Sequence, residues 1–204
     1  LEKVGIGFRK LLLRKDVPFT REDLPNNQSQ YLQTHKTPPF VKLLQAITRV
    51  PGINIVRFIT SNPWDFHDEL INEIACNKKI DRYVHLPVQS GSDNVLYRMN
   101  RGYTKKNYLD LVKKLRDKVA SVVIGTDIIV GFPGETDDDF NETVDLAKKV
   151  QWKIGFVAMY SPRPGTAAWR IYPDDVPHSV KKKRWEILDK IINKDTMSER
   201  PKVV

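Results

Sequence analysis

Cysteine is nearly absent from this chain of 204 residues, which contains Cys76 alone. A single cysteine excludes an internal disulfide and cannot by itself supply the ligands of a zinc or iron–sulfur site. The four histidines, His35, His67, His85 and His178, are isolated in the sequence and show no spacing typical of a metal site. The sequence therefore predicts no metal ligands in this chain, and we interpret Cys76 as a small buried residue on a helix face.

Long apolar runs are also lacking. No segment approaches the roughly 18 consecutive apolar residues that a membrane-spanning helix needs, and Leu1–Lys15 lacks the order of charge, apolar core and cleavage site of a signal peptide. We therefore expect a cytoplasmic protein without a membrane partner. With 40% hydrophobic and 29% charged residues, the chain resembles a soluble globular domain. Its formal net charge of +9 favours a polyanionic partner such as RNA.

The chain divides into three parts by composition. Residues 1–39 have no clean hydrophobic period and are rich in proline and amides toward their end, which predicts a poorly ordered leader or insertion. Residues 40–193 alternate between strand and helix patterns, and residues 194–204 form a tail. The predicted strands are Ile53–Ile59, Tyr83–Val88, a run that begins at Val122, and Ile154–Tyr160. This alternation predicts an α/β fold with a parallel sheet, which must be open or incomplete because four strands cannot close an eight-stranded barrel.

The stretch Thr126–Thr136 organises the predicted fold. It reads as a buried strand, a glycine turn and the start of a helix, with Thr136 and Asp139 at the spacing of a capping box. Asp127 interrupts the otherwise apolar strand, and a buried carboxylate is costly unless a partner compensates its charge. Asp127 is thus a candidate site residue, although it could equally hydrogen-bond to neighbouring backbone as a structural group.

Polar or glycine-rich residues follow all four predicted strands. In parallel α/β folds ligands bind beyond the carboxyl ends of the strands, so these ends together predict a binding face, although each alone would be an ordinary turn. They are Thr60–Asn62, Gln89–Ser92, Gly131–Glu135 and Tyr160–Ser161.

Three further features have two readings each. Arg101, in the loop before a predicted helix, could hold a carboxylate or phosphate, or could be solvated. His85 fits a hydrogen-bonded core histidine better than a ligand. Lys181–Arg184 places basic residues at a helix start, where cations are unfavourable, so they either contact phosphate or form a solvated face.

The motifs resemble those of the radical S-adenosylmethionine (SAM) methylthiotransferases, in the branch that modifies tRNA. The matching segments are Ile55–Pro63, His85–Asp93, Met99–Thr104, Thr126–Thr136 and Tyr160–Thr166. The resemblance implies a partial, TIM-like β/α barrel in which the four strands correspond to the third to sixth of the family. It also implies SAM, 4Fe–4S clusters, a tRNA substrate, a sulfur donor and an electron donor.

The resemblance assigns site residues as well. The family contacts the ribose or methionine part of SAM after its fourth strand and flanks the adenine with its fifth and sixth strands. The SAM-binding residues implied are Gln89, Ser90, Gly91, Ile129, Gly131, Tyr160 and Ser161. Asp127 and Arg101 fall at polar positions that face the same mouth, and we expect them to be the catalytic residues.

The departures from the family pattern are equally clear. The cysteine loop that holds the radical-generating cluster is absent from this sequence, as are an amino-terminal cluster domain and a carboxyl-terminal RNA-binding barrel. The expected function is therefore that of a fragment of an enzyme that adds a methylthio group to carbon 2 of an N6-modified adenosine, inactive by itself. The alternative is a non-catalytic module that binds RNA or the cofactor.

Overall fold

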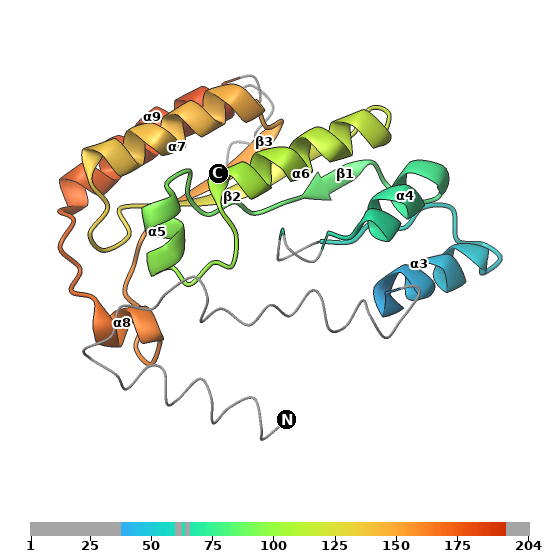
Figure 1. Ribbon diagram of the computed structural model, residues 1–204, viewed down its shortest axis with the longest axis horizontal. Helices are drawn as coiled ribbons and strands as arrows, with labels where there is room; N and C mark the ends of the chain where they lie inside the picture. The colour runs from blue at the N-terminus through green and yellow to red at the C-terminus, as the bar shows by residue number, and fades with distance from the viewer. Residues whose placement is uncertain (1–37, 60–62, 64–65, 195–204) are drawn as a thin grey trace, which may run out of the picture.

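A computed structural model describes residues 38–59, 63 and 66–194 of the chain (Figure 1). Its helices are α3 (Pro39–Arg49), α4 (Asp68–Cys76), α5 (Asp93–Arg98), α6 (Lys105–Lys118), α7 (Asp137–Val150), α8 (Ala167–Ile171) and α9 (His178–Ile192). Its strands are β1 (Tyr83–His85), β2 (Val123–Val130) and β3 (Ile154–Met159). The predicted leader, apart from Pro38 and Pro39, and the predicted tail, apart from Lys194, lie outside the described residues.

The three strands form a parallel sheet in the order β1-β2-β3. Tyr83 pairs with Val123 at one edge, and Asp127 pairs with Phe156 in the longer β2–β3 ladder. Parallel neighbours need crossover connections, and α6 and α7 supply helices in the two crossovers. The predicted α/β fold with an open parallel sheet is confirmed.

The first predicted strand, Ile53–Ile59, was wrong as a full strand. Within the described residues it is reduced to a single parallel bridge between Val56 and Ile80. The bridge is not continued, because the next backbone N–H that points to the same side, that of Tyr83, donates to the side chain of Asp81 at 3.0 Å. Without further pairing, Ile55 and Ile59 are 65% and 81% exposed.

The helices α6, α7 and α9 cover one face of the sheet (Figure 1). Successive strand residues point to opposite faces, and on β2 the residues Ile124, Thr126 and Ile128 are buried in the core on the helical side. Asp127 and Ile129 alternate with them and are only half-buried. We call the opposite side, which presents Asp127 and Ile129, the open face of the sheet.

The capping box predicted at Thr136 is present, and the structure adds a second one at Thr104 that was not predicted. Thr104 and Asn107 cap α6, and the side chains of Thr136 and Asp139 exchange hydrogen bonds with each other's backbone N–H at the start of α7. These reciprocal bonds satisfy donors that a helix start leaves unpaired. They fix where α7 begins, directly after the loop that follows β2.

Candidate functional site

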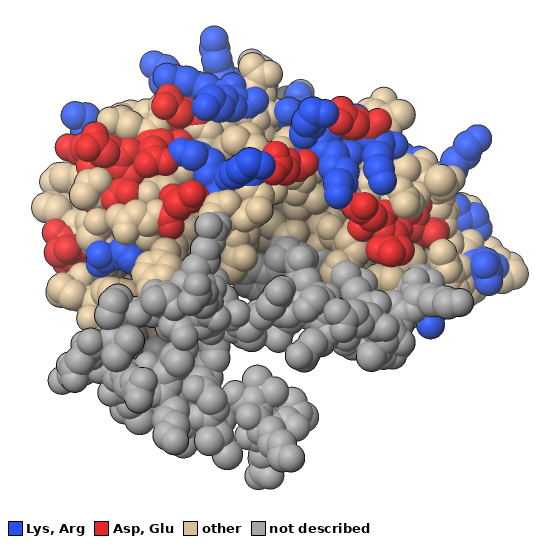
Figure 2. All heavy atoms as spheres, in the orientation of Figure 1, with Lys and Arg blue, Asp and Glu red and all other residues tan. Residues whose placement is uncertain are grey.

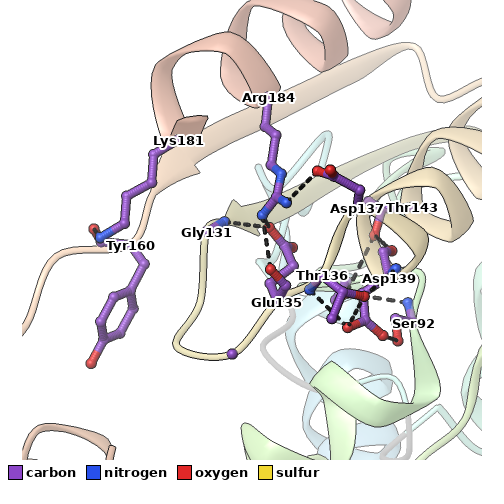
Figure 3. Close-up of polar contacts among 12 residues, drawn as sticks. Ser92, Gly131, Glu135, Thr136, Asp137, Asp139, Thr143, Tyr160, Lys181 and Arg184 are labelled. Carbon is purple, nitrogen blue, oxygen red and sulfur yellow. Dashed lines mark hydrogen bonds and ion pairs between the residues drawn. The ribbon is translucent and has the colours of Figure 1, made fainter. Parts of the chain in front are cut away.

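The loop after β2 is anchored to α9 by a buried ion pair (Figure 3). Oε2 of Glu135 accepts hydrogen bonds from the Gly131 N–H at 2.6 Å and from Nη1 of Arg184 at 2.7 Å, while Nη2 of Arg184 donates to Asp137 at 2.8 Å. Burial raises the pKa of the Glu135 carboxyl, although these donors and the charge of Arg184 oppose the rise. The ends of the loop therefore cannot move independently of α9.

Lys181, one turn earlier on α9, anchors the end of β3. Its Nζ donates to the backbone carbonyl of Tyr160 at 3.2 Å (Figure 3). It also binds the carboxylate of Asp174. Its aliphatic stem covers Gly131, whose φ of +69° and lack of a side chain permit the close approach. One helix thus sets the distance between the strand ends at Gly131 and Tyr160.

These contacts correct part of the prediction for the basic cluster 181–184. Lys181 and Arg184 are 4% and 5% exposed and hold carboxylates of this chain, so neither is available to RNA phosphates. Lys182 and Lys183 remain exposed. Acidic residues in loops that pack against α9 therefore explain why Lys181 and Arg184 stand near the start of this helix.

The turn after β1 is packed against α7. Ser90 is fully buried with its hydroxyl 3.3 Å from that of Thr143, and the Gly91 N–H donates to the same Thr143 hydroxyl at 2.9 Å. A Cβ at Gly91 would overlap the backbone of Thr143. Ser90 and Gly91, both predicted to contact SAM, therefore hold the turn against α7, and this contact restrains the backbone of the adjacent Gln89.

Gln89, a predicted SAM-binding residue, pairs with the central strand β2 through its backbone. Its backbone N–H donates to the Asp127 carbonyl at 2.8 Å, and its carbonyl accepts from the Ile129 N–H at 2.9 Å. Its φ of +69° is uncommon for a residue with a side chain. The structure thus brings Gln89, Asp127 and Ile129 together.

Asp127 is not a closed structural group. Its side chain is 39% exposed on the open face, and Oδ1 lies 3.1 Å from Nε2 of His85. Nδ1 of His85 in turn lies 3.1 Å from the Tyr83 hydroxyl, which makes a row of three polar side chains on two strands. Burial, then the nearby Asp127 charge, raises the pKa of Tyr83. The preferred reading of His85 as a hydrogen-bonded residue agrees with this geometry.

Of the remaining predicted residues, Tyr160 and Ser161 follow β3, and Arg101 lies between α5 and α6. Tyr160 is half-buried with its ring 5.0 Å from that of Phe132, and Ser161 is exposed. Arg101 is half-buried, and its Nε is buried without a hydrogen-bond partner among the described residues. The segment Thr60–Asn62 lies outside the described residues.

Arg98 was missed by the sequence reasoning. Its guanidinium lies 4.7 Å from the centre of the Tyr172 ring and fills the space beside Gly134, where a side chain would clash with it. The Gly134 N–H donates to Asp175 at 2.7 Å. Arg98 therefore links α5, the loop after β2 and the segment before α9, and no pattern in the sequence connects these segments.

Across the described ranges, no group of three or more His, Cys, Asp or Glu side chains could hold a metal ion. The interpretation of Cys76 as buried was wrong: it is exposed at the last position of α4, because the buried face of that helix is formed by Leu70, Ile71 and Ile74.

Comparisons with known proteins assign this chain to a family. The profile described as "Radical SAM superfamily" matches residues 29–147. The chain belongs to the radical SAM superfamily. In the solved radical SAM enzyme coproporphyrinogen III oxidase (HemN) from Escherichia coli, 36% of the chain superposes on 78% of this one, with a TM-score of 0.57 and 20% identity. That likeness concerns the fold and agrees with a partial radical SAM barrel.

Curated relatives within the superfamily carry the name tRNA-2-methylthio-N(6)-dimethylallyladenosine synthase. The protein from Thermotoga petrophila is 50% identical over 183 residues, which are 89% of this chain and 39% of the relative. The protein from Clostridium tetani is 43% identical over 207 residues, which are 100% of this chain and 44% of the relative. The radical SAM chain thus spans less than half the length of these relatives, and its resemblance to the methylthiotransferases is confirmed.

None of the helices in the described part of this radical SAM chain combines the length and apolar character needed to cross a membrane.

Proposed function

We propose that this chain provides the carboxyl-terminal half of the catalytic barrel of a tRNA methylthiotransferase. The intact enzyme would add a methylthio group to carbon 2 of an N6-dimethylallyl-type adenosine in tRNA. The observation that carries the proposal is the identity of 50% to a synthase of that name along 89% of this chain. The proposed barrel unit is residues 40–193, flanked by a leader and a tail.

The described residues fit a SAM molecule at the carboxyl ends of the strands. The guanidinium of Arg101 would bind the carboxylate of the methionine part, and Gln89 would contact the ribose or methionine from the turn that Ser90 and Gly91 shape. Ile129 and Gly131 would flank the adenine from β2, and Tyr160 and Ser161 from β3. Bound SAM would supply the radical, and these residues would bind and orient it.

A 4Fe–4S cluster does not fit the residues of this chain. Such clusters are held by several cysteine thiolates, whereas Cys76 is the single cysteine of the sequence. The cluster ligands, the sulfur donor and the electron donor would come from outside the matched region. Within the chain, Asp127 and Arg101 remain our proposed catalytic residues, and a role in tRNA modification would place the protein in the cytoplasm.

A non-catalytic RNA-binding module is the competing function, favoured by the net charge of +9. Figure 2 shows that Lys and Arg side chains on the visible face are interspersed with Asp and Glu over the helical layer. Interspersed charges make a weaker footprint for RNA than a patch of one sign. The visible face thus gives no particular support to an RNA-binding module, and the identity to the synthases favours the enzyme.

A chimaera tests the proposal. The matched 183-residue stretch of the Thermotoga petrophila synthase would be replaced by the corresponding residues of this chain and expressed in a bacterial strain that lacks the endogenous enzyme. Mass spectrometry of digested tRNA should then detect 2-methylthio adenosine. A chimaera that folds and binds tRNA but leaves the adenosine unmodified, while the parent synthase modifies it, would favour the non-catalytic module.

A further inference from the structure

The open face of the sheet carries an aromatic ring beside a carboxylate. Phe156 of β3 pairs with Asp127 of β2 in the ladder, so the two side chains lie next to each other on this face. Phe156 is 61% exposed as a residue, and the side chain of Asp127 is 39% exposed. Phe156 makes an edge contact with His85, with ring centres 6.0 Å apart and planes at 61°.

The carboxylate is held in a defined orientation. Its Oδ1 lies 3.1 Å from Nε2 of His85, which is itself held by the Tyr83 hydroxyl at 3.1 Å from Nδ1. The Tyr83 hydroxyl occupies the space above Gly125, where any side chain would overlap it. Gly125 therefore permits the row Tyr83–His85–Asp127 to form, and His85 and Tyr83 in this row orient the carboxylate of Asp127.

The exposed ring of Phe156 beside the oriented carboxylate of Asp127 suits one kind of ligand. An aromatic side chain offers a stacking surface to a planar base, and an ionised carboxylate only accepts hydrogen bonds. The ligand that satisfies both is a planar heterocycle with an N–H on its edge. Two residues along the ladder, Ile129 and Ala158 form an apolar pair on the same face, which suits an apolar substituent beside that N–H.

We propose that Phe156 and Asp127 bind the target adenine of the tRNA, with the ring stacked on Phe156 and the exocyclic N6–H donated to Asp127. His85 and Tyr83 are positioning residues that orient the carboxylate, and the N6-dimethylallyl group lies against Ala158. This assignment rests on the proposed function and names the substrate contacts of the same site. The adenine of SAM also carries an N6–H on its edge, so the experiment has to distinguish the adenine of tRNA from the adenine of SAM.

Binding of N6-dimethylallyladenosine to the 204-residue chain, measured by calorimetry, is the first test. Phe156→Ala should weaken binding by about 5- to 150-fold, the range expected for the loss of one stacked base, and Phe156→Trp should restore it. Asp127→Asn should also weaken binding. The matched controls are Trp169→Ala, which removes an exposed ring from α8, and Asp110→Asn, which neutralises an exposed carboxylate on α6. Both should change binding by less than about twofold.

A second nucleoside isolates the hydrogen bond. N6,N6-dimethyladenosine lacks the N6–H, so its binding should be equal in the unaltered chain and Asp127→Asn but still fall in Phe156→Ala. His85→Ala should weaken N6-dimethylallyladenosine and leave N6,N6-dimethyladenosine unchanged. A merely structural role of His85 would lower the binding of both nucleosides alike.

Several outcomes would overturn the inference. It fails if N6-dimethylallyladenosine does not bind, if the Phe156 and Asp127 variants behave like their controls, or if they weaken SAM and spare the nucleoside. The chimaera separates this failure from failure of the proposed function. A chimaera that methylthiolates tRNA as well with Phe156→Ala as without it refutes the contacts alone, whereas an inactive unaltered chimaera refutes the function.

Discussion

Arg184 and Glu135 form an ion pair at 2.7 Å in which the side chains are only 6% and 1% exposed. They lie 49 residues apart in the sequence, on α9 and on the loop after β2. The pair explains how a loop rich in glycine keeps one shape at the mouth of the sheet. A loop that is fixed before the ligand arrives loses less entropy on binding.

Removal of one partner of this pair should be strongly destabilising. Arg184→Met leaves the buried Glu135 carboxylate without its counter-charge, and we expect a loss of about 3–5 kcal/mol in the free energy of unfolding. The double variant Arg184→Met/Glu135→Gln should recover part of that loss, because the neutral amide still accepts from Gly131. Lys182→Met, on the exposed side of α9, should cost less than about 0.5 kcal/mol in the same urea titrations.

The pH dependence of the Arg184→Met variant provides a second check. Burial raises the pKa of Glu135, so its contribution to stability is full below the unfolded-state pKa and is lost as pH rises through the folded-state value. The difference in stability between the variant and the unaltered chain should therefore shrink as pH falls toward that range. A difference that stays constant with pH would show that Glu135 is not the group left unpaired.

Asp139 should contribute stability in the opposite sense. Burial disfavours its charged form, but hydrogen bonds from Ser92 and Thr136 outweigh burial and lower its pKa. Its contribution is thus present above the unfolded-state pKa and disappears as pH falls through the folded-state value. We expect Asp139→Asn to cost about 1–3 kcal/mol at neutral pH, measured by thermal and urea unfolding.

The adjacent Asp138 is the matched control for Asp139. It is exposed in the same first turn of α7, and only its interaction with the helix dipole is lost in Asp138→Asn. That loss should be about 0.3–1 kcal/mol. Equal effects of the two substitutions would contradict a special role for the bond at 2.6 Å between Ser92 and Asp139.

Tyr103 should limit stability at alkaline pH. Its hydroxyl donates to the Val88 carbonyl at 2.9 Å, and burial raises its pKa to about 12. Stability from this group is complete below its unfolded-state pKa of about 10 and is lost as pH rises through the folded value. Tyr103→Phe should therefore be less stable at neutral pH, and its unfolding curve should fall less steeply above pH ~10.

The exposed half of the basic cluster should account for any RNA contact there. Replacement of Lys182 and Lys183 by Gln should reduce the salt dependence of tRNA binding by about 0.7–0.9 per lost phosphate contact. Lys181→Gln should instead lower the unfolding temperature, because Lys181 holds Asp174 and the Tyr160 carbonyl. An unchanged slope in the double variant would assign Lys182 and Lys183 to a solvated face.

Local sequence determined much of the secondary structure. The apolar run before Gly131, the capping boxes at Thr104 and Thr136, and the strand–helix alternation follow from side-chain periodicity and helix-end chemistry, which act over a few residues. The same motifs sufficed to indicate the radical SAM superfamily. Asp127 stood out because a carboxylate in an apolar strand needs a partner.

Tertiary structure decided which side chains meet. The side chains of Asp127 and His85 lie 3.1 Å apart because β1 and β2 pair in one register, and a shift of one residue would put them on opposite faces. Likewise, only the packing of α9 against the loop after β2 turned two of four consecutive basic residues inward to carboxylates. Strand register and helix docking depend on contacts between distant segments, which a local sequence pattern does not encode.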